Sequence, residues 1–587
     1  MTTIEAVRSR LVHHRGNPEH YKWIALSNTT LGIVMATINQ SIVIIALPAI
    51  FRGIKLDPLV SSNTSYLLWM LLGFMVVMAV LVVSLGRVGD MFGRVRMYNL
   101  GFLVFTVGSV LLSVSWMQGS SAALWLIVWR VVQGIGAACL FANSSAILTD
   151  AFPADERGLA LGINMVAAIA GSFIGLVLGG VLAPVAWRLV FLVSVPFGLI
   201  GTVWAYYMLE ERGIRRPAKI DWLGNITFAV GLIAVLVGIT YGILPYGGHS
   251  MGWTAPGVIG AIAGGIVVLI AFLIIETRVP APMFRLPLFR IRAFSGGSVA
   301  TFLSALARGG LMFMLILWLQ GIWLPIHGYS FSDTPLWAGI YMLPLSVGFL
   351  VAGPFAGRLA DHYGARPFTL GGMIVSAIAL LLLVTLPVDF SYWSFGLLIF
   401  VVGLAMGLFA APNQTGIMNS LPPDQRGAGA GMTATFMGSA SVLSIGIFFS
   451  LIIAGLSSKL PRALYSGLTA HGVSHHYATQ VSHLPPVGTL FSAFLGKNPM
   501  KTVLGPELHR LPPATANYLT GHRFFPTLVS EPFASGIHAA FYFAAGCCVV
   551  AAIASWFRGG KYYYTEDAAD DAPPVAAEEQ PEVAAVR

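Results

Sequence analysis

Long apolar stretches dominate the chain, and short polar segments that carry most of its arginines and lysines separate them. An apolar helix needs ~20 residues to cross a bilayer. Backbone groups in lipid must be hydrogen-bonded within the protein, so these stretches are expected to be helices. The pattern predicts fourteen of them: residues 24–48, 63–85, 97–117, 122–149, 158–183, 188–209, 221–242, 255–275, 294–320, 334–357, 367–387, 391–418, 427–455 and 535–558.

The composition excludes a water-soluble globular protein. Of 587 residues, 56% are hydrophobic and only 10% are charged, whereas soluble domains carry about 25% charged residues. The mean hydropathy is +0.79. No secretory signal is expected, because residues 1–22 are polar and basic without an apolar stretch. The three cysteines (Cys139, Cys547 and Cys548) lie in predicted spans, so no disulfide framework is expected.

The net charge of +9 comes from arginines and lysines at the ends of the spans. This arrangement indicates membrane topology rather than a nucleic-acid surface. The even-numbered connections carry most of the basic residues, and the short odd-numbered ones carry only Arg52, Lys55 and Arg188. Because cytoplasmic connections are enriched in basic residues, the pattern predicts a multi-pass plasma-membrane protein with both termini in the cytoplasm.

Two loop patterns occur twice. Residues 86–94 (GRVGDMFGR) recur 271 positions later at 357–365 (GRLADHYGA), and residues 152–158 (FPADERG) recur 269 positions later at 421–427 (LPPDQRG). Nearly equal offsets predict two homologous halves of parallel orientation, an arrangement typical of transporters that rock around a central site. The offset exceeds a six-helix half by about two spans, so two further helices are expected between the halves.

This arithmetic divides the chain into five parts. A cytoplasmic segment and a six-helix bundle come first, followed by two inserted helices with their linkers. A second six-helix bundle contains a large outer loop, and an acidic, alanine- and proline-rich tail is expected to be disordered. The boundaries are 1–23, 24–209, 210–293, 294–558 with the outer loop at 456–534, and 559–587.

The first repeated pattern predicts a tight turn between two spans. Its glycines permit the chain reversal and close helix approach, and Asp150 at the end of the fourth span is a suitable partner for Arg94. Such a cluster can latch one side of a transporter in one state. The alternative is a basic cytoplasmic turn without a gating role. The gating candidates are Gly86, Asp90, Gly93, Arg94, Asp150, Gly357, Arg358 and Asp361.

Several segments together resemble the major facilitator superfamily, and within it the fourteen-span drug:proton antiporter branch. They are the turn at Gly86–Arg94, the fourth-span segment Arg130–Ala137, the first-span segment Ile38–Pro48, Asp221–Gly224 before the inserted pair, and Pro412-Asn413. The resemblance covers residues 24–455 and 535–558. It implies an all-α fold of two six-helix bundles plus two inserted helices.

The resemblance also implies a function. It implies a secondary active transporter, not an enzyme, that exports small amphipathic compounds of the multidrug type by alternating access. Such exporters are usually driven by proton influx, work as monomers and use no cofactor.

One departure concerns the driving force. The branch usually has a carboxylate where this chain has Asn39, and no Asp or Glu lies near the middle of a predicted span. An amide cannot carry a proton, whereas a buried carboxylate can. Three possibilities stay open: protons use peripheral carboxylates, the coupling differs, or transport is passive.

Two cations lie inside predicted spans. Because a charge is costly in hydrocarbon, each is expected to face a cavity or a partner. The resemblance places Arg130 near the proton path, and pairing with backbone carbonyls is the alternative. Arg308 could attract an anionic group of a substrate or pair with a polar helix. Gln133, Asn413 and Gln414 are candidate cavity residues that could equally form hydrogen bonds between helices.

The fifth predicted span carries glycines on one face. Gly171, Gly175 and Gly179 recur every four residues, and Gly180 follows. Such spacing permits close contact with a neighbouring helix. The resemblance links this stretch to the antiporter motif, although Leu176 replaces the usual proline. Tight packing and a seal between the two halves are both compatible with the pattern.

Two other functions were weighed. A translocase of lipids or cell-envelope precursors would use the same fold, and the large outer loop favours it. A membrane-embedded lipid-modifying enzyme would need a catalytic cluster, and the sequence offers only the outer-loop histidines His471, His475 and His476. No nucleophile elbow, phosphate-binding loop or zinc-peptidase pattern is present, so neither a metal nor a nucleotide cofactor is expected.

Overall fold

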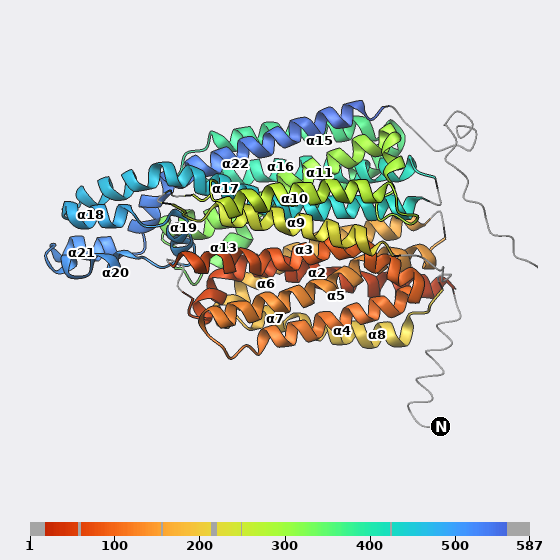
Figure 1. Cartoon of the computed structure of the whole chain (residues 1–587), viewed down its shortest axis with the longest axis horizontal. Coiled ribbons are helices and arrows are strands. Elements are labelled where there is room, and N and C mark those ends of the chain that lie inside the picture. The colour runs from red at the N-terminus through yellow and green to blue at the C-terminus, as the bar shows by residue number, and fades with distance from the viewer. Residues whose placement is uncertain are drawn as a thin grey trace, which may run out of the picture.

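The computed structural model describes residues 18–56, 60–153, 156–212, 220–247, 249, 251–422 and 425–559. Their long helices run roughly parallel to one axis (Figure 1). Within these residues no strand forms, and one isolated bridge joins Tyr246 and His249. The all-α fold predicted from the apolar pattern is therefore confirmed.

Fourteen helical segments are long and apolar enough to cross a membrane, as the sequence predicts. The helices of the first bundle and the inserted pair are α2 (Pro18–Gly53), α3 (Ser61–Phe92), α4 (Arg94–Ser113), α5 (Gly119–Ala151), α6 (Arg157–Val185), α7 (Leu189–Leu192), α8 (Ser194–Met208), α9 (Trp222–Gly242) and α10 (Pro256–Glu276). The spans that follow are α11 (Arg292–Trp318), which continues through the π-helical turn η2 (Leu319–Trp323) into α12 (Leu324–Ile326), α13 (Thr334–Tyr341), α14 (Leu343–Tyr363), α15 (Ala365–Val384), α16 (Tyr392–Asn419), α17 (Arg426–Thr469) and α22 (Phe524–Phe557).

Helix contacts group the spans into two bundles. In the N-terminal bundle, α2 packs on α6, and α5 packs on both α3 and α4. In the C-terminal bundle, α16 packs on α14 and α15, while α11, α17 and α22 pack on one another. The inserted helices α9 and α10 pack together, and α9 also contacts α3 and α17. Each bundle therefore has its own helix contacts, and the inserted pair lies beside both.

The two ends of the molecule differ in the segments they contain. The basic end contains the turns at Gly93 and Gly364, together with the start of α2 and the end of α22. The loop end contains the segment between α17 and α22, with α18 (His475–Ser482), α19 (Pro486–Phe494), α20 (Met500–Leu504), η3 (Gly505–His509) and α21 (Pro513–Thr520). Figure 1 shows α18, α20 and α21 projecting beyond the bundles.

The two bundles repeat the same backbone turn. Gly93 joins α3 to α4 with φ +118°, and Gly364 joins α14 to α15 with φ +82°, 271 positions later. Each glycine donates its N–H to the carbonyl four residues earlier, Gly89 or Ala360. Positive φ is costly for residues with a Cβ, so glycine is needed at both turns.

A matching close approach supports the duplication. A Cβ added to Gly101 of α4 would lie 3.0 Å from the Gly136 carbonyl oxygen of α5, and one added to Gly372 of α15 would lie 2.6 Å from the Ala405 oxygen of α16. Gly101 and Gly372 differ by 271 positions, and Gly136 and Ala405 by 269. The same helices therefore cross at the same places in both bundles.

Several predicted helix boundaries differ from the observed ones because of proline. Pro196 lies in the first turn of α8, and the predicted span 188–209 is divided at Val193. Pro344 begins α14, and the span 334–357 is divided at Met342. Proline lacks an N–H and clashes with the carbonyl four residues earlier. Both breaks lie within four residues before a proline.

The predicted outer loop 456–534 contains more helix than expected. Helix α17 has 44 residues and α22 has 34, so at 1.5 Å per residue each is longer than the ~30 Å hydrocarbon layer. Both extend beyond the predicted spans at the loop end. Most of residues 1–23 and the tail beyond Gly559 lie outside the described residues.

Candidate functional site

A buried polar network surrounds Arg130 in the N-terminal bundle. The Arg130 side chain is 1% exposed. Its guanidinium donates to Asn39 Oδ1 of α2, to Gln133 Oε1 at 2.9 Å and to the Met70 carbonyl at 3.3 Å. The network continues from Gln133 to Ser109 and from Asn39 to Ser194. Five spans of the bundle, those of α2, α3, α4, α5 and α8, are joined by this one set of hydrogen bonds.

No carboxylate neutralises Arg130 within the described residues. Its nearest aromatic partner is Phe74, with the guanidinium carbon 4.4 Å from the ring centre. Asn39 thus meets the arginine at the position where the antiporter branch usually has a carboxylate. The predicted coupling residues Asn39, Arg130 and Gln133 lie together. Asn39 and Arg130 are 91 residues apart in the sequence, so the sequence alone does not indicate their contact.

Arg308 has a different environment. It lies 16 residues along α11 from the basic end, and its side chain is half-buried. No ion pair or hydrogen bond to its side chain is found among the described residues, and its guanidinium carbon lies 5.6 Å from the ring centre of Phe349 on α14. An unpaired cation at this depth can receive an anionic or hydrogen-bond-accepting group.

Asn413 is held inside the C-terminal bundle. Its amide donates to the Gly297 carbonyl at 3.1 Å and to the Thr301 hydroxyl at 2.8 Å. Its oxygen accepts from the buried guanidinium of Arg558 at 2.8 Å. The structure therefore places Asn413 in a helix-to-helix hydrogen-bond set. The adjacent Gln414 is half-buried and lies outside this set.

The turn at the basic end of the N-terminal bundle carries an ion-pair cluster. Arg94 bonds Asp90 and Asp150 at 2.7 Å each, and about a quarter of the Arg94 and Asp150 side chains is exposed. Pairs with this much exposure usually contribute less than ~1 kcal/mol each. The cluster joins α3, α4 and α5 within one bundle, and none of its members pairs with the C-terminal bundle in the described residues.

In the described part of the repeated turn of the C-terminal bundle, no ion pair matches this cluster. Gly86 and Gly357 occupy matching positions. A Cβ added to Gly86 would lie 3.7 Å from the Cβ of Ala142, and one added to Gly357 would lie 3.9 Å from the Cβ of Ala411. Arg358 is exposed, and the Asp361 side chain lies outside the described residues. The position that corresponds to Arg94 is Ala365.

The sequence reading missed Glu211 at the same end. Its carboxylate accepts from the backbone N–H groups of Val95 and Arg96 at 3.3 and 3.4 Å. These are orphan donors at the start of α4, where a negative charge is favourable. Lys22 adds a second ion pair to Glu156 at 2.7 Å. An acidic residue just after the sixth span was the available signal.

The glycine face of α6 packs mainly within its own bundle. Cβ atoms added at Gly171, Gly175 and Gly179 would lie 3.0, 2.5 and 2.9 Å from carbonyl oxygens of α2. Gly180 alone faces the other bundle, where an added Cβ would lie 2.5 Å from the Leu336 Cα of α13. The expected seal between halves therefore involves Gly180, while the three-glycine face forms the α2–α6 contact.

Two contacts join the bundles toward the loop end. Gln320, in the π-helical turn η2, donates to the Ile45 carbonyl of α2 at 3.0 Å. Helix α6 meets α13, where a Cβ added at Gly339 would lie 3.0 Å from the Leu176 carbonyl. Gln320 is fully buried. Pi-helical turns often mark functional positions, and this one directs a side chain across the bundle interface.

Helix α19 from the loop-end segment also contacts both bundles. All nine of its residues are buried. It packs on α3 of the N-terminal bundle and on η2, α17 and α22 of the C-terminal bundle. Phe491 stacks on Phe449 of α17 with ring centres 5.2 Å apart. A segment predicted as a solvated loop therefore includes a helix that closes over the bundle ends.

Toward the basic end, the bundles meet through α3 and α17. A Cβ added at Gly438 would lie 3.0 Å from the Cβ of Ala79, and one added at Gly431 would lie 3.5 Å from Val83. The bundles therefore touch on both sides of Arg308. Small residues carry much of this contact, and among the described residues the Gln320–Ile45 hydrogen bond joins the bundles at the loop end.

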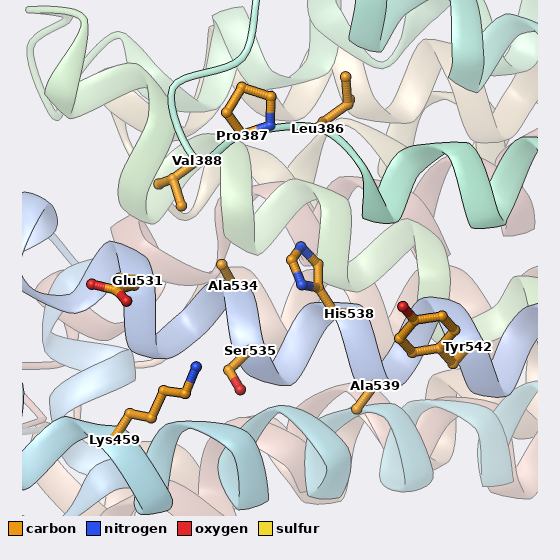
Figure 2. A pocket seen from close by; sticks show the side chains of 10 residues that line it. All are labelled: Leu386, Pro387, Val388, Lys459, Glu531, Ala534, Ser535, His538, Ala539 and Tyr542. Carbon is orange, nitrogen blue, oxygen red and sulfur yellow. The ribbon is translucent and has the colours of Figure 1, made fainter.

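A groove of about 510 Å³ lies at the loop end of the C-terminal bundle. Figure 2 shows Glu531, Ser535, His538 and Tyr542 along α22, with Lys459 of α17 on one side and residues 386–388 on the other. Lys459, Glu531 and Tyr542 are exposed. Its lining comes from the C-terminal bundle alone, so this groove is separate from the interface between the bundles.

The described residues contain no group of three or more His, Cys, Asp or Glu side chains that could hold a metal. His471 lies 5.2 Å from the ring of Tyr518, and His475 lies 5.9 Å from the ring of Tyr465. These histidines are engaged in stacking contacts with tyrosine at the loop end.

Comparison with known proteins agrees with this geometry. Residues 29–221 and 220–445 match the family model of the Major Facilitator Superfamily. The chain is 31% identical over 442 residues to the methylenomycin A resistance protein of Bacillus subtilis, covering 74% of this chain and 88% of that protein. It is 27% identical over 477 residues to the riboflavin transporter RibZ of Clostridioides difficile, covering 80% and 97%.

A third relative is the tetracenomycin C resistance and export protein of Streptomyces glaucescens, 26% identical over 487 residues, with 81% of this chain and 84% of that protein covered. Among solved structures, the peptide transporter POT in complex with sulfate has a TM-score of 0.52 at 15% identity, covering 85% and 95%; at this identity the likeness shows the fold alone. The fourteen spans and the resistance proteins fit the drug:proton antiporter branch. The chain belongs to the Major Facilitator Superfamily and is a membrane transporter of small molecules, not an enzyme.

Proposed function

We propose that the protein exports amphipathic small molecules by alternating access, with its basic end in the cytoplasm. The observation that carries the proposal is Arg308, an unpaired, half-buried cation between the two levels at which the bundles touch. The relatives named for antibiotic resistance and export support the outward direction. The basic connections support the orientation, because cytoplasmic segments are enriched in arginine and lysine.

The cargo contacts follow from the chemistry around Arg308. Its guanidinium offers several hydrogen-bond donors and a permanent charge, and the ring of Phe349 beside it offers an apolar face. A cargo with an apolar body and an anionic or accepting group would satisfy both. The amphipathic cargo would therefore present this group to Arg308.

Alternating access requires two states. In one, the loop-end contacts open while those at the basic end persist, and in the other the basic-end contacts open while those at the loop end persist. The Gln320–Ile45 hydrogen bond and the Gly180–Leu336 contact would break when the loop end opens. Helix α19 would have to leave α3 in the same step, because it contacts both bundles. A hydrogen bond contributes only ~1 kcal/mol, so this closure can be reversed by cargo binding.

Proton coupling is also part of the proposal. Asn39 cannot titrate, and the buried carboxylates among the described residues (Asp221, Glu276 and Glu507) lie near helix ends. Coupling would therefore use carboxylates away from the middle of the membrane. Passive transport remains the competing outcome of the experiment below.

The test is transport by the purified protein in proteoliposomes under an imposed pH gradient. Amphipathic dyes that carry an anionic group are compared with cationic ones. Arg308→Gln should reduce transport of the anionic set at least tenfold, because the charge that receives the cargo is lost. Arg462→Gln, on an exposed position of α17, is the matched control and should leave transport unchanged. Failure of the parent protein to move any amphiphile would reject the export function.

A lipid or cell-envelope precursor is the second candidate cargo. The groove beside α22 favours it, since its exposed Lys459 and Glu531 offer charges to a zwitterionic headgroup above the apolar helix surface. Mass spectrometry of lipids that co-purify with the protein distinguishes the two. A specific lipid that is lost in the Lys459→Gln variant would favour lipid cargo, and dye transport by lipid-free protein would favour the export of drugs.

A further inference from the structure

Two buried carboxyl groups face each other at the basic end of the inserted helices. Asp221 precedes α9 and is 6% exposed, and Glu276 ends α10 and is 3% exposed. A Cβ added to Gly224 would touch Asp221 Oδ2 and would lie 2.6 Å from Glu276 Oε1. One oxygen of each carboxyl group therefore borders the same space beside Gly224.

Each carboxyl group uses one oxygen for a backbone N–H and leaves the other unpaired. Asp221 Oδ1 accepts from the Gly224 N–H at 2.7 Å, which caps α9, and Glu276 Oε2 accepts from the Phe284 N–H at 2.8 Å. Asp221 Oδ2 and Glu276 Oε1 have no hydrogen-bond partner and are buried. The two unpaired oxygens are those on either side of Gly224.

Neither carboxyl group forms an ion pair with a basic side chain in the described part of the chain. The rings of Phe228, Phe272 and Phe284 lie in mutual contact beside this buried pair. Two negative charges cannot remain side by side in such a place without a counter-charge. One proton between the two oxygens removes one charge and supplies the missing hydrogen bond.

A small cavity lies between Asp221 and α3. It has a volume of about 10 Å³, close to the ~10–15 Å³ that a single water molecule needs. Its polar lining is Asp221 and Asn225 from α9 with Ser84 and Arg87 from α3. Arg87 is the one basic residue of this lining, and its guanidinium donates to the Pro282 carbonyl at 3.3 Å instead of to Asp221.

We propose that Asp221 and Glu276 hold one shared proton and form the proton-binding site of the transporter. On release, the O–H bond breaks, the proton passes to water in the adjacent cavity, and the pair keeps two negative charges. Arg87 then turns from the Pro282 carbonyl to Asp221 and carries α3 with it. Because α3 is also the helix that meets α17 across the bundle interface, proton release would act on the closure at the basic end. This role rests on the proposed proton-coupled export.

The first experiment reads the proton directly, without transport. Infrared spectra of the purified protein near neutral pH should show the carbonyl band of a buried, protonated carboxylic acid. Glu276→Gln should abolish this band, while Glu531→Gln, which removes an exposed carboxylate of α22, should preserve it. Absence of the band from the parent protein, or its persistence in Glu276→Gln, overturns the proposal. So does loss of the band on adding sodium at constant pH, because the pair would then be a cation site.

The second experiment separates this site from the export function. Glu276→Gln imitates the protonated acid, so the variant should fold and keep energy-independent exchange of cargo across the membrane. The accumulation of cargo driven by a pH gradient should fall at least tenfold in this variant. In Arg87→Gln the same accumulation should fall by a similar factor. Gradient-driven accumulation that survives in Glu276→Gln rejects the proton site and leaves export standing. A parent protein without any exchange rejects export, while the infrared result still decides the state of the pair.

Discussion

In the N-terminal bundle, the residue after the turn glycine is Arg94, which pairs with Asp90 and Asp150 at 2.7 Å each. In the C-terminal bundle, the matching turn at Gly364 is followed by Ala365, and the position matching Asp150 is Asn419. The backbone turns agree, although the charges do not. The fold of this turn therefore depends on glycine, and the charge cluster must be explained by something other than folding.

The interiors of the bundles differ in the same way. The N-terminal bundle has the hydrogen-bond network of Arg130, Asn39 and Gln133. The C-terminal bundle instead contains an aromatic group in which Trp318 meets Phe390 at 4.8 Å and Phe395 at 6.0 Å between ring centres. The two bundles share one frame but differ in chemistry: the first has the buried network of Arg130, and the second combines the buried Asn413–Arg558 pair near its basic end with the aromatic group of Trp318 and the unpaired Arg308.

The largest expected effect breaks the shared turn. Gly93→Ala should destabilise the protein by about 2–3 kcal/mol, because φ of +118° is strained for alanine and the added Cβ would lie 2.5 Å from Glu211 Oε2. Gly364→Ala should cost about 1–2 kcal/mol from backbone strain. Unfolding of the purified variants in detergent measures both. Gly257→Ala, where no atom lies within 4 Å, is the control, and equal losses at all three positions would contradict the account.

The second prediction tests the polar interior. Asn39→Asp should raise stability by about 1–2 kcal/mol, because Arg130 gains a charged acceptor and hydrogen bonds to charged groups are the stronger ones. Asn39→Leu should lower it by a similar amount, because Arg130 loses an acceptor. Thermal unfolding near neutral pH measures whether the stabilities of Asn39→Asp, the parent protein and Asn39→Leu fall in that order. A less stable N39D variant would mean that Arg130 is not the residue that decides the energetics of this network.

The third prediction concerns the contact between the bundles. Gln320→Leu removes the hydrogen bond to the Ile45 carbonyl, worth ~1 kcal/mol, and should raise the share of molecules open at the loop end by about fivefold. Labelling of a cysteine introduced at Leu336 of α13 reports that opening. Gln414→Leu, which alters a half-buried amide within the C-terminal bundle, should leave labelling unchanged. Equal labelling of both variants would remove Gln320 from the closure.

The smallest effect separates the two turns by charge. Asp150→Asn breaks one of the two pairs of Arg94 and should cost about 0.5–1 kcal/mol, because the groups are partly exposed. Asn419→Asp places a carboxylate at the matching position, where Ala365 instead of an arginine directly follows the turn glycine, and should change stability little. High salt should weaken the first effect. If the parent and Asp150→Asn transport equally well, the cluster is a basic turn without a gating role.

The spans and the duplication could be read from the sequence because both depend on local patterns. Runs of apolar residues predict helices in lipid without any knowledge of the segments that pack against them. Gly93 and Gly364 indicate a turn, because glycine tolerates the positive φ that such a turn requires. Asp150 as a partner of Arg94 followed from the expected end of the fourth span. These inferences need only the residue types and their spacing along one helix or one turn.

Contacts between distant segments could not be read in this way. Asn39 and Arg130 were both singled out, yet their contact depends on how α2 packs against α5. The proximity of Glu276 to Asp221 requires α9 and α10 to lie side by side, and no pattern along either helix indicates it. Helix α19 was assigned to a solvated loop, since its composition does not reveal that two bundles would bury it.

The central claim is that the two bundles rock about the level of Arg308, and spin-label distances test it most directly. After replacement of the native cysteines, one pair of labels is placed at Phe92 and Tyr363 at the basic end and another at Trp116 and Trp393 at the loop end, all exposed positions. In proteoliposomes, cargo and a pH change should lengthen one distance while they shorten the other. Distances that stay fixed, or that change together in the same direction, would contradict the account.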